Sequence, residues 1–222
     1  CRKSVWKIVS LGIFSLDPSI QVILIPVLVF ALSFHEFAHG WMAHRLGDST
    51  AKNQGRLTLN PLAHLDPIGA LVLYFAGFGW AKPVPVNGSN LVNPRTDMMK
   101  IAFAGPASNI LLAVIGGIVL RILIGSSIFY ESVYVTLIYF TQINIALAVF
   151  NMLPIPPLDG SQIFNGYMVT RNPGLVMKLQ TYGPQILFGI ILIGYVTKFS
   201  VIWMIMGPIV KMFMYLFSGV YF

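Results

Sequence analysis

Long apolar runs, which few charged residues interrupt, make up most of this chain. One run occupies residues 98–124 and another occupies residues 133–153. A helix needs about 20 largely apolar residues to cross a hydrocarbon core about 30 Å thick, and both runs reach that length. Charged residues amount to 9% of the 222 residues, whereas an ordinary soluble domain carries about 25%. The sequence therefore predicts a protein embedded in a membrane.

The apolar runs predict an all-α polytopic membrane protein with about five to six transmembrane helices. The expected helices are, in chain order, about 20–46, 98–124, 133–153, 183–197 and 201–220. The first three are core helices and the last two are C-terminal helices. Residues 5–16 account for a possible sixth, as a partial span or an interfacial helix. We expect residues 1–222 to form a single membrane-embedded domain.

The connection between the first two core helices has a different composition. Residues 47–97 are rich in Asn, Pro and Gly. The apolar run 68–80 is too short to span comfortably and contains Gly77 and Gly79, which favours a re-entrant or interfacial segment. Apolar residues then alternate along 80–86, a pattern typical of a β-like segment, although a plain loop is an equal alternative.

The basic residues predict how the chain is oriented. The formal net charge is +7, but Lys and Arg form no block or stripe, so anionic lipid headgroups explain them better than nucleic acid does. The basic residues at or between the first two core helices are Arg45, Lys52, Arg56, Lys82, Arg95 and Lys100. The turn 125–132 carries none. By the positive-inside rule, residues 47–97 face the cytoplasm, and we expect a multi-pass protein of the cell (plasma) membrane.

The sequence His35-Glu36-Phe37-Ala38-His39 is an HExxH motif within the first core helix. At about 100° per residue, the two histidines lie about 40° apart on the helix, so they can bind one zinc ion together. Glu36 lies about 100° from His35 and can reach a zinc-activated water without becoming a ligand. Zinc lowers the pKa of that water toward neutrality, and Glu36 can accept its proton.

The motif is short, and on a soluble helix it is more often structural than catalytic. Ionisable residues inside a membrane span are costly, however, and are functional candidates by default. A catalytic zinc site needs a third protein ligand. The metzincin pattern is excluded because Met42 and Arg45 occupy its Gly and His positions, and the gluzincin pattern is disfavoured because Glu131, the only later Glu, lies at the opposite membrane face.

The remaining acidic candidates are Asp48, Asp66, Asp97 and Asp159, of which the first three belong to the polar connection. Asp159 alone follows a spanning helix, and this helix returns the chain to the cytoplasmic face where the HExxH helix ends. The sequence therefore favours a metal site of His35, His39 and Asp159. No cysteine ligand is expected, because the only cysteine is Cys1.

Two other histidines lie near the motif in sequence. His44 is nine residues after His35, about 180° around the helix, so it cannot share the same metal and is expected at headgroup level. His64 could contribute a hydrogen bond near the site, but a role in stabilising its loop is the favoured interpretation.

Three segments together carry a resemblance to a known family: the HExxH motif, Gly105-Pro106-Ala107-Ser108-Asn109, and Asn151-Met152-Leu153-Pro154-Ile155-Pro156-Pro157-Leu158-Asp159-Gly160. With them the chain resembles the site-2 protease family of intramembrane zinc metalloproteases, peptidase family M50. It is most similar to the compact subgroup without PDZ or CBS domains. The resemblance implies that Asp159 is the third zinc ligand and that Asn151 engages substrate or stabilises negative charge. A helix-packing role is the alternative for Asn151.

The resemblance implies hydrolysis of peptide bonds within or near transmembrane segments, with Glu36 as the catalytic base and one Zn²⁺ as cofactor. The cellular role would be regulated intramembrane proteolysis or the clearance of signal-peptide remnants. In the family, a β-like segment near residues 80–86 can accept an extended substrate by strand addition. The expected partners are a transmembrane protein or peptide substrate and the lipid bilayer, with no nucleic acid. A membrane metal transporter and a catalytically silent scaffold are the alternatives.

Overall fold

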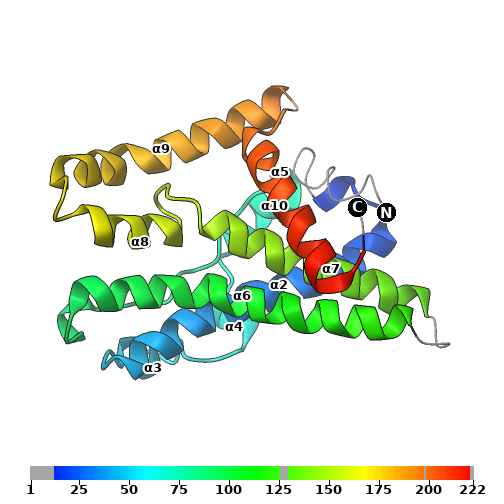
Figure 1. Cartoon of the computed structure of the whole chain (residues 1–222), viewed down its shortest axis with the longest axis horizontal. Coiled ribbons are helices and arrows are strands. Elements are labelled where there is room, and N and C mark those ends of the chain that lie inside the picture. Colours follow the sequence, from blue (N-terminus) through cyan, green and yellow to red (C-terminus); the bar gives the residue numbers. More distant parts are fainter. Residues whose placement is uncertain (1–12, 126–129, 198, 221–222) are drawn as a thin grey trace.

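The computed structural model describes residues 13–125, 130–197 and 199–220. Within these residues the regular elements are all helical (Figure 1). In chain order they are η1 Ile13–Ser15, α2 Pro18–Arg45, α3 Thr50–Asn53, α4 Pro61–His64, α5 Pro67–Ala76, η2 Gly88–Asn90, α6 Pro94–Ile124, α7 Glu131–Asn151, α8 Asp159–Met168, α9 Pro173–Thr197 and α10 Val201–Ser218. The predicted all-α class is confirmed.

Five of these helices are long and apolar enough to cross a membrane. They are α2, α6, α7, α9 and α10. This number agrees with the predicted five to six spans and with a polytopic membrane protein. Most of the candidate sixth span, residues 5–12, lies outside the described residues, and residues 13–15 form the short helix η1.

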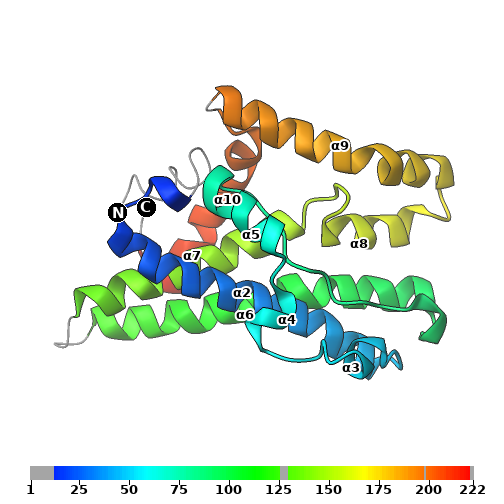
Figure 2. The ribbon, with the colours of Figure 1, turned by 180° about the vertical axis from the view of Figure 1, so that it is seen from behind.

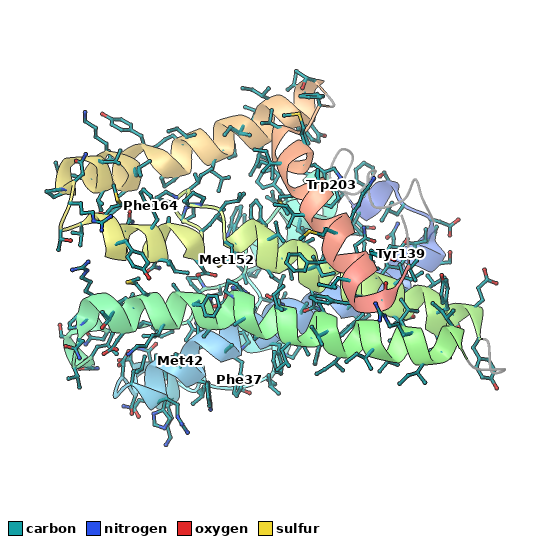
Figure 3. All side chains as sticks on the ribbon, viewed as in Figure 1. Phe37, Met42, Tyr139, Met152, Phe164 and Trp203 are labelled. Carbon is teal, nitrogen blue, oxygen red and sulfur yellow. The ribbon has the colours of Figure 1, made fainter. Side chains whose placement is uncertain are left out.

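Helix α6 extends along most of the length of the molecule (Figures 1 and 2) and contacts α2, α7, α8 and α10. Helix α10 crosses both α6 and α7. These three helices share a core that includes Ala113, Ile145 and Val210, and Trp203, labelled in Figure 3, belongs to it. Helix α9 lies on the outer flank, against α8 and α10.

Two helical segments differ from the sequence prediction. Helix α8 lies between the predicted helices 133–153 and 183–197, where no helix was expected, and α9 begins at Pro173, ten residues before the predicted start at 183. Polar residues such as Lys178 occupy the exposed side of the first turns of α9, so a search for continuous apolar runs passes over them. The start of α9 is favoured by Pro173 at the first helical position and by Asn172, whose Oδ1 accepts from Leu175 N.

The connection from α2 to α6 contains a short apolar helix, α5, and little strand structure. Asp66 begins α5 by accepting a hydrogen bond from Gly69 N at 2.8 Å. Gly77 ends α5 in the left-handed conformation at φ 75°. At 10 residues α5 is too short to span, as expected for a re-entrant or interfacial segment. The β-like feature is limited to one antiparallel bridge between Leu65 and Ala81.

Candidate metal centre

His35 and His39 of α2 converge with Asp159 at the start of α8. Asp159 Oδ2 lies 3.1 Å from His35 Nε2 and 3.4 Å from His39 Nε2. The two Nε2 atoms are 3.0 Å apart, and one donor atom from each residue lies within 4.8 Å of the others. Two imidazole nitrogens and a carboxylate oxygen are the donor set of a catalytic zinc site. The residues present therefore fit zinc, whereas the assignment of each as a ligand stays a prediction.

The connection between α7 and α8 places Asp159 in the group. Gly160, the next residue, packs so closely against the Met152 carbonyl that a side chain would not fit. Ser161 helps to fix the first turn of α8 by donating from Oγ to Leu158 O at 2.6 Å. The Asp159 carboxylate thereby brings an anionic oxygen donor to the two imidazoles.

A buried amide network orients the His35 ring. Asn109 of α6, which is fully buried, places Oδ1 2.6 Å from His35 Nδ1. Its Nδ2 donates to Asn144 Oδ1 of α7 at 2.9 Å and to Ala31 O at 3.3 Å. Because a backbone carbonyl can only accept, this amide orientation makes Asn109 Oδ1 the acceptor for His35. His35 therefore carries its proton on Nδ1 and presents the Nε2 lone pair to the group.

His39 is oriented in the same way by α6. Its Nδ1 lies 2.7 Å from Ile101 O, so Nδ1 carries the proton and Nε2 is free to bind a metal. Gly105 of α6 packs against both rings. A Cβ atom at position 105 would lie 2.5 Å from His39 Nε2 and 2.6 Å from His35 Cε1. Gly105 therefore lets α6 pack directly against the two imidazoles of the metal centre.

Glu36 lies outside the converging group and contacts the connection between α2 and α6. Its Oε2 accepts a hydrogen bond from Val84 N at 3.0 Å. Val84, at the end of the segment 80–84, therefore lies against the residue that is predicted to be the catalytic base. A carboxylate held next to two metal-binding imidazoles can move a proton at the reacting centre.

The other predicted residues lie outside the group. Asn151, the last residue of α7, donates from Nδ2 to Leu147 O at 3.0 Å, and its predicted role at the substrate is untested. His44 Nδ1 is 3.1 Å from Ser49 Oγ. His64 is 1% exposed and its Nε2 lies 2.7 Å from Thr58 O, as expected of a residue that stabilises its own loop.

The sequence analysis did not identify the two amides that support His35. Asn109 was noted only as part of the segment 105–109 that carries the family resemblance, and Asn144 was not considered. The sequence did contain a signal for both residues, since each is an asparagine within an apolar run. Burying an asparagine in a membrane helix costs free energy unless its amide finds a polar partner. Which partner each one finds depends on the packing of α2, α6 and α7.

Comparisons with known proteins identify the family of the chain. The sequence profile of Peptidase family M50 matches residues 122–194, which include α7 and α8. YwhC of Bacillus subtilis, provisionally named a zinc metalloprotease, is 35% identical over 210 residues, which cover 91% of this chain and 94% of YwhC.

A more distant relative carries the same provisional name. Rip2 of Mycolicibacterium smegmatis is 28% identical over 149 residues, which cover 63% of this chain and 54% of Rip2. No solved structure matches the chain. The similarity to YwhC along nearly the whole of both chains establishes the family, and the names of the relatives indicate zinc as its metal. This chain therefore belongs to peptidase family M50, the site-2 protease family of zinc metalloproteases.

Proposed function

We propose that the chain is an intramembrane zinc protease that hydrolyses peptide bonds within or next to transmembrane segments. The observation that carries the proposal is the convergence of His35, His39 and Asp159 beside Glu36, within a helix long and apolar enough to span a membrane. In this proposal the first three residues bind one zinc ion and Glu36 is the catalytic base.

Each residue has a defined part in the reaction. Zinc, when bound, supplies a Lewis acid that polarises the scissile carbonyl and makes water more acidic. Glu36 accepts the proton of the attacking water and returns it to the leaving amine. The Val84 N–H fixes the direction of the Glu36 carboxylate. Asn151 has a second amide hydrogen, besides the one donated to Leu147 O, with which to bind substrate or developing negative charge.

The membrane setting constrains the substrate. A transmembrane helix satisfies all of its backbone hydrogen bonds internally, so its peptide bonds must be exposed by local unwinding before water can attack them. Segments with helix-breaking residues unwind at the lowest cost. We therefore assign transmembrane segments that contain Gly, Pro or similar residues as the preferred substrates.

Two other functions account less well for the site. A membrane metal transporter would also place His and Asp in spanning helices, but it has no need of Glu36 next to the first ligand. A catalytically silent scaffold would need neither the ligands nor the base. The relatives named as zinc metalloproteases also favour the protease.

The cellular setting follows from the same proposal. The basic connection between α2 and α6 supports an orientation in which the metal centre faces the cytoplasmic side of the cell membrane. A protease there would release a membrane-tethered regulator or remove remnants of signal peptides. Peptides that accumulate in membranes when the protein is inactivated would distinguish the two roles.

The test is cleavage of transmembrane peptides by the purified chain in liposomes, with bound zinc measured on the same samples. Glu36→Gln is expected to retain zinc and to lose cleavage by about 10²–10⁴-fold. Glu131→Gln makes the same chemical change at an exposed position at the start of α7, and it should leave both measurements unchanged. Undiminished cleavage by Glu36→Gln would disprove the proposed mechanism.

A further inference from the structure

A cavity of about 100 Å³ lies between α2, α5 and the loop that follows α4. Its walls are almost entirely apolar, with Leu32 from α2 and Ala70 and Leu73 from α5. None of the residues that converge at the metal centre lines it. The cavity therefore needs an explanation that zinc binding does not provide.

The cavity lies on the same face of α2 as Glu36. The α2 residues that line it include Ile25 and Val29, and at about 100° per residue these lie about 20° to either side of Glu36 on the helix. Ser33, also in the lining, is one turn before Glu36. The wall formed by Trp80 and Ala81 continues along the chain to Val84, which donates to Glu36. The cavity is thus next to the predicted base along two separate segments.

Two polar side chains of the cavity, His64 and Ser33, can accept hydrogen bonds. His64 lines it and is 1% exposed. Because His64 Nε2 bonds to the Thr58 carbonyl, Nε2 carries the proton and Nδ1 is a bare acceptor. Nδ1 has no hydrogen-bond partner among the described residues. Ser33 donates its hydroxyl hydrogen to Val29 O at 2.7 Å, so it too offers an acceptor. A buried acceptor without a partner is costly, and an occupant with an N–H group would satisfy it.

We propose that this cavity is a substrate subsite, which takes one aliphatic side chain of the unwound transmembrane segment beside the bond that is cleaved. His64 Nδ1 accepts a hydrogen bond from a backbone N–H that unwinding has freed. This inference rests on the proposed protease function. An unwound segment in apolar surroundings needs hydrogen-bond acceptors for its free N–H groups. The proposal therefore explains why an apolar cavity beside Glu36 contains the acceptors of His64 and Ser33.

The first test detects binding without hydrolysis. The Glu36→Gln chain is placed in phosphatidylethanolamine and phosphatidylglycerol vesicles with transmembrane peptides that carry photo-leucine at successive positions. One position is expected to crosslink to the cavity wall, at Leu73 or Tyr74. Ala70→Leu in the same background fills the cavity and should reduce this crosslink about tenfold. Leu71→Phe enlarges a residue that is 59% exposed on the same helix and should leave it unchanged.

The crosslinks also distinguish the subsite from the protease proposal. Crosslinks at the cavity without cleavage by the parent chain would support the subsite and count against the proposed function. Cleavage by the parent chain with crosslinks elsewhere, or with capture of vesicle lipid only, would overturn the subsite.

The second test measures selectivity in the catalytic chain. Peptides carry Ala or Leu at the crosslinked position. Ala70→Leu should lower the ratio of kcat/KM for the Leu peptide to that for the Ala peptide about tenfold. An unchanged ratio would overturn the proposal.

The acceptor role of His64 has its own readout. Replacing the amide N–H next to the bound side chain by an ester oxygen should slow cleavage by the parent about tenfold, since a buried acceptor is left without its donor. The His64→Phe chain, which has no acceptor at this position, should cleave the ester peptide as fast as it cleaves the amide peptide. Equal ester effects in both chains would exclude the hydrogen bond.

Discussion

At the scale of single residues, the metal centre depends on groups that do not touch the metal. The Nδ1 atoms of His35 and His39 face Asn109 Oδ1 and Ile101 O, both of α6. Such partners fix the tautomer and the direction of a ligating imidazole. Asn109 is itself held by Asn144. We therefore assign Asn109 as a positioning residue for His35.

Substituting Asn109 by Leu should weaken zinc binding, because His35 loses the acceptor that keeps the proton on Nδ1. The expected loss is about 10–100-fold in affinity, measured by competition with a chelator on the purified chain. Asn109→Asp retains an acceptor and should recover most of the affinity. Thr141→Val is the control, since Thr141 is equally buried on α7 and its hydroxyl has no partner among the described residues. Equal zinc affinities in the Leu variant and the parent would contradict this role.

At the scale of elements, Asp48 joins the end of α2 to the segment that precedes α6. Its Oδ1 accepts from Thr50 N and Thr50 Oγ1 and from Asn90 Nδ2, and its Oδ2 accepts from Asn87 N. Residues 87–90 follow directly after the segment that contacts Glu36 through Val84. The buried carboxylate of Asp48 therefore anchors the connection that runs alongside the predicted base.

Asp48→Asn should lower thermal stability in a pH-dependent way. Burial works to raise the pKa of Asp48, but hydrogen bonds from Thr50, Asn90 and Asn87 bring it below its usual value of 3.8. The stabilisation is therefore present above about pH 4 and is lost as the pH falls through the lowered pKa. At neutral pH the variant should lose about 1–3 kcal/mol, and the difference from the parent should narrow in acid.

The measurement is the unfolding temperature in detergent between pH 3 and pH 7. Asp17→Asn is the control, because Asp17 is an exposed N-cap of α2 whose role Asn can also fill. A destabilisation of Asp48→Asn that did not change with pH would show that the carboxylate charge plays no part.

The elements differ in how far the sequence predicts them. The spanning helices can be predicted from the apolar runs. The position of Asp159 near the histidines can be predicted because α7 returns the chain to the membrane face at which α2 ends. Helix α8 was missed because it is short and polar, and short helices depend on tertiary packing for their stability. The contact of Glu36 with Val84 joins residues 48 positions apart along the chain, and the cavity beside it likewise combines α2 with the distant helix α5. No local sequence pattern predicts either feature.

At the scale of the whole molecule, the metal centre is sunk into the bundle. His35 is ten residues before Arg45, where α2 ends, which corresponds to about 15 Å along the helix axis. It is also enclosed by α6, which packs against α2 throughout this region (Figure 2). Substrate and water therefore have to reach the proposed catalytic residues between helices or along the connection from α2 to α6.

The proposed orientation can be tested with single cysteines. In a Cys1→Ser background, Asn53→Cys places a thiol at the exposed end of α3 and Glu131→Cys places one at the exposed start of α7. A membrane-impermeant maleimide should label position 53 only in inverted vesicles and position 131 in intact cells, because α6 separates the two connections. The reverse pattern would show that the metal centre faces the other side.

The lack of space beside Gly105 gives a simple criterion for comparing genomes. A methyl group at this position would collide with both imidazole rings of the metal centre, so alanine there should act as a permanent block to metal binding even when every ligand is intact. A related gene that keeps the histidines, the glutamate and the aspartate but encodes a larger residue than glycine at this point is expected to specify a pseudoenzyme.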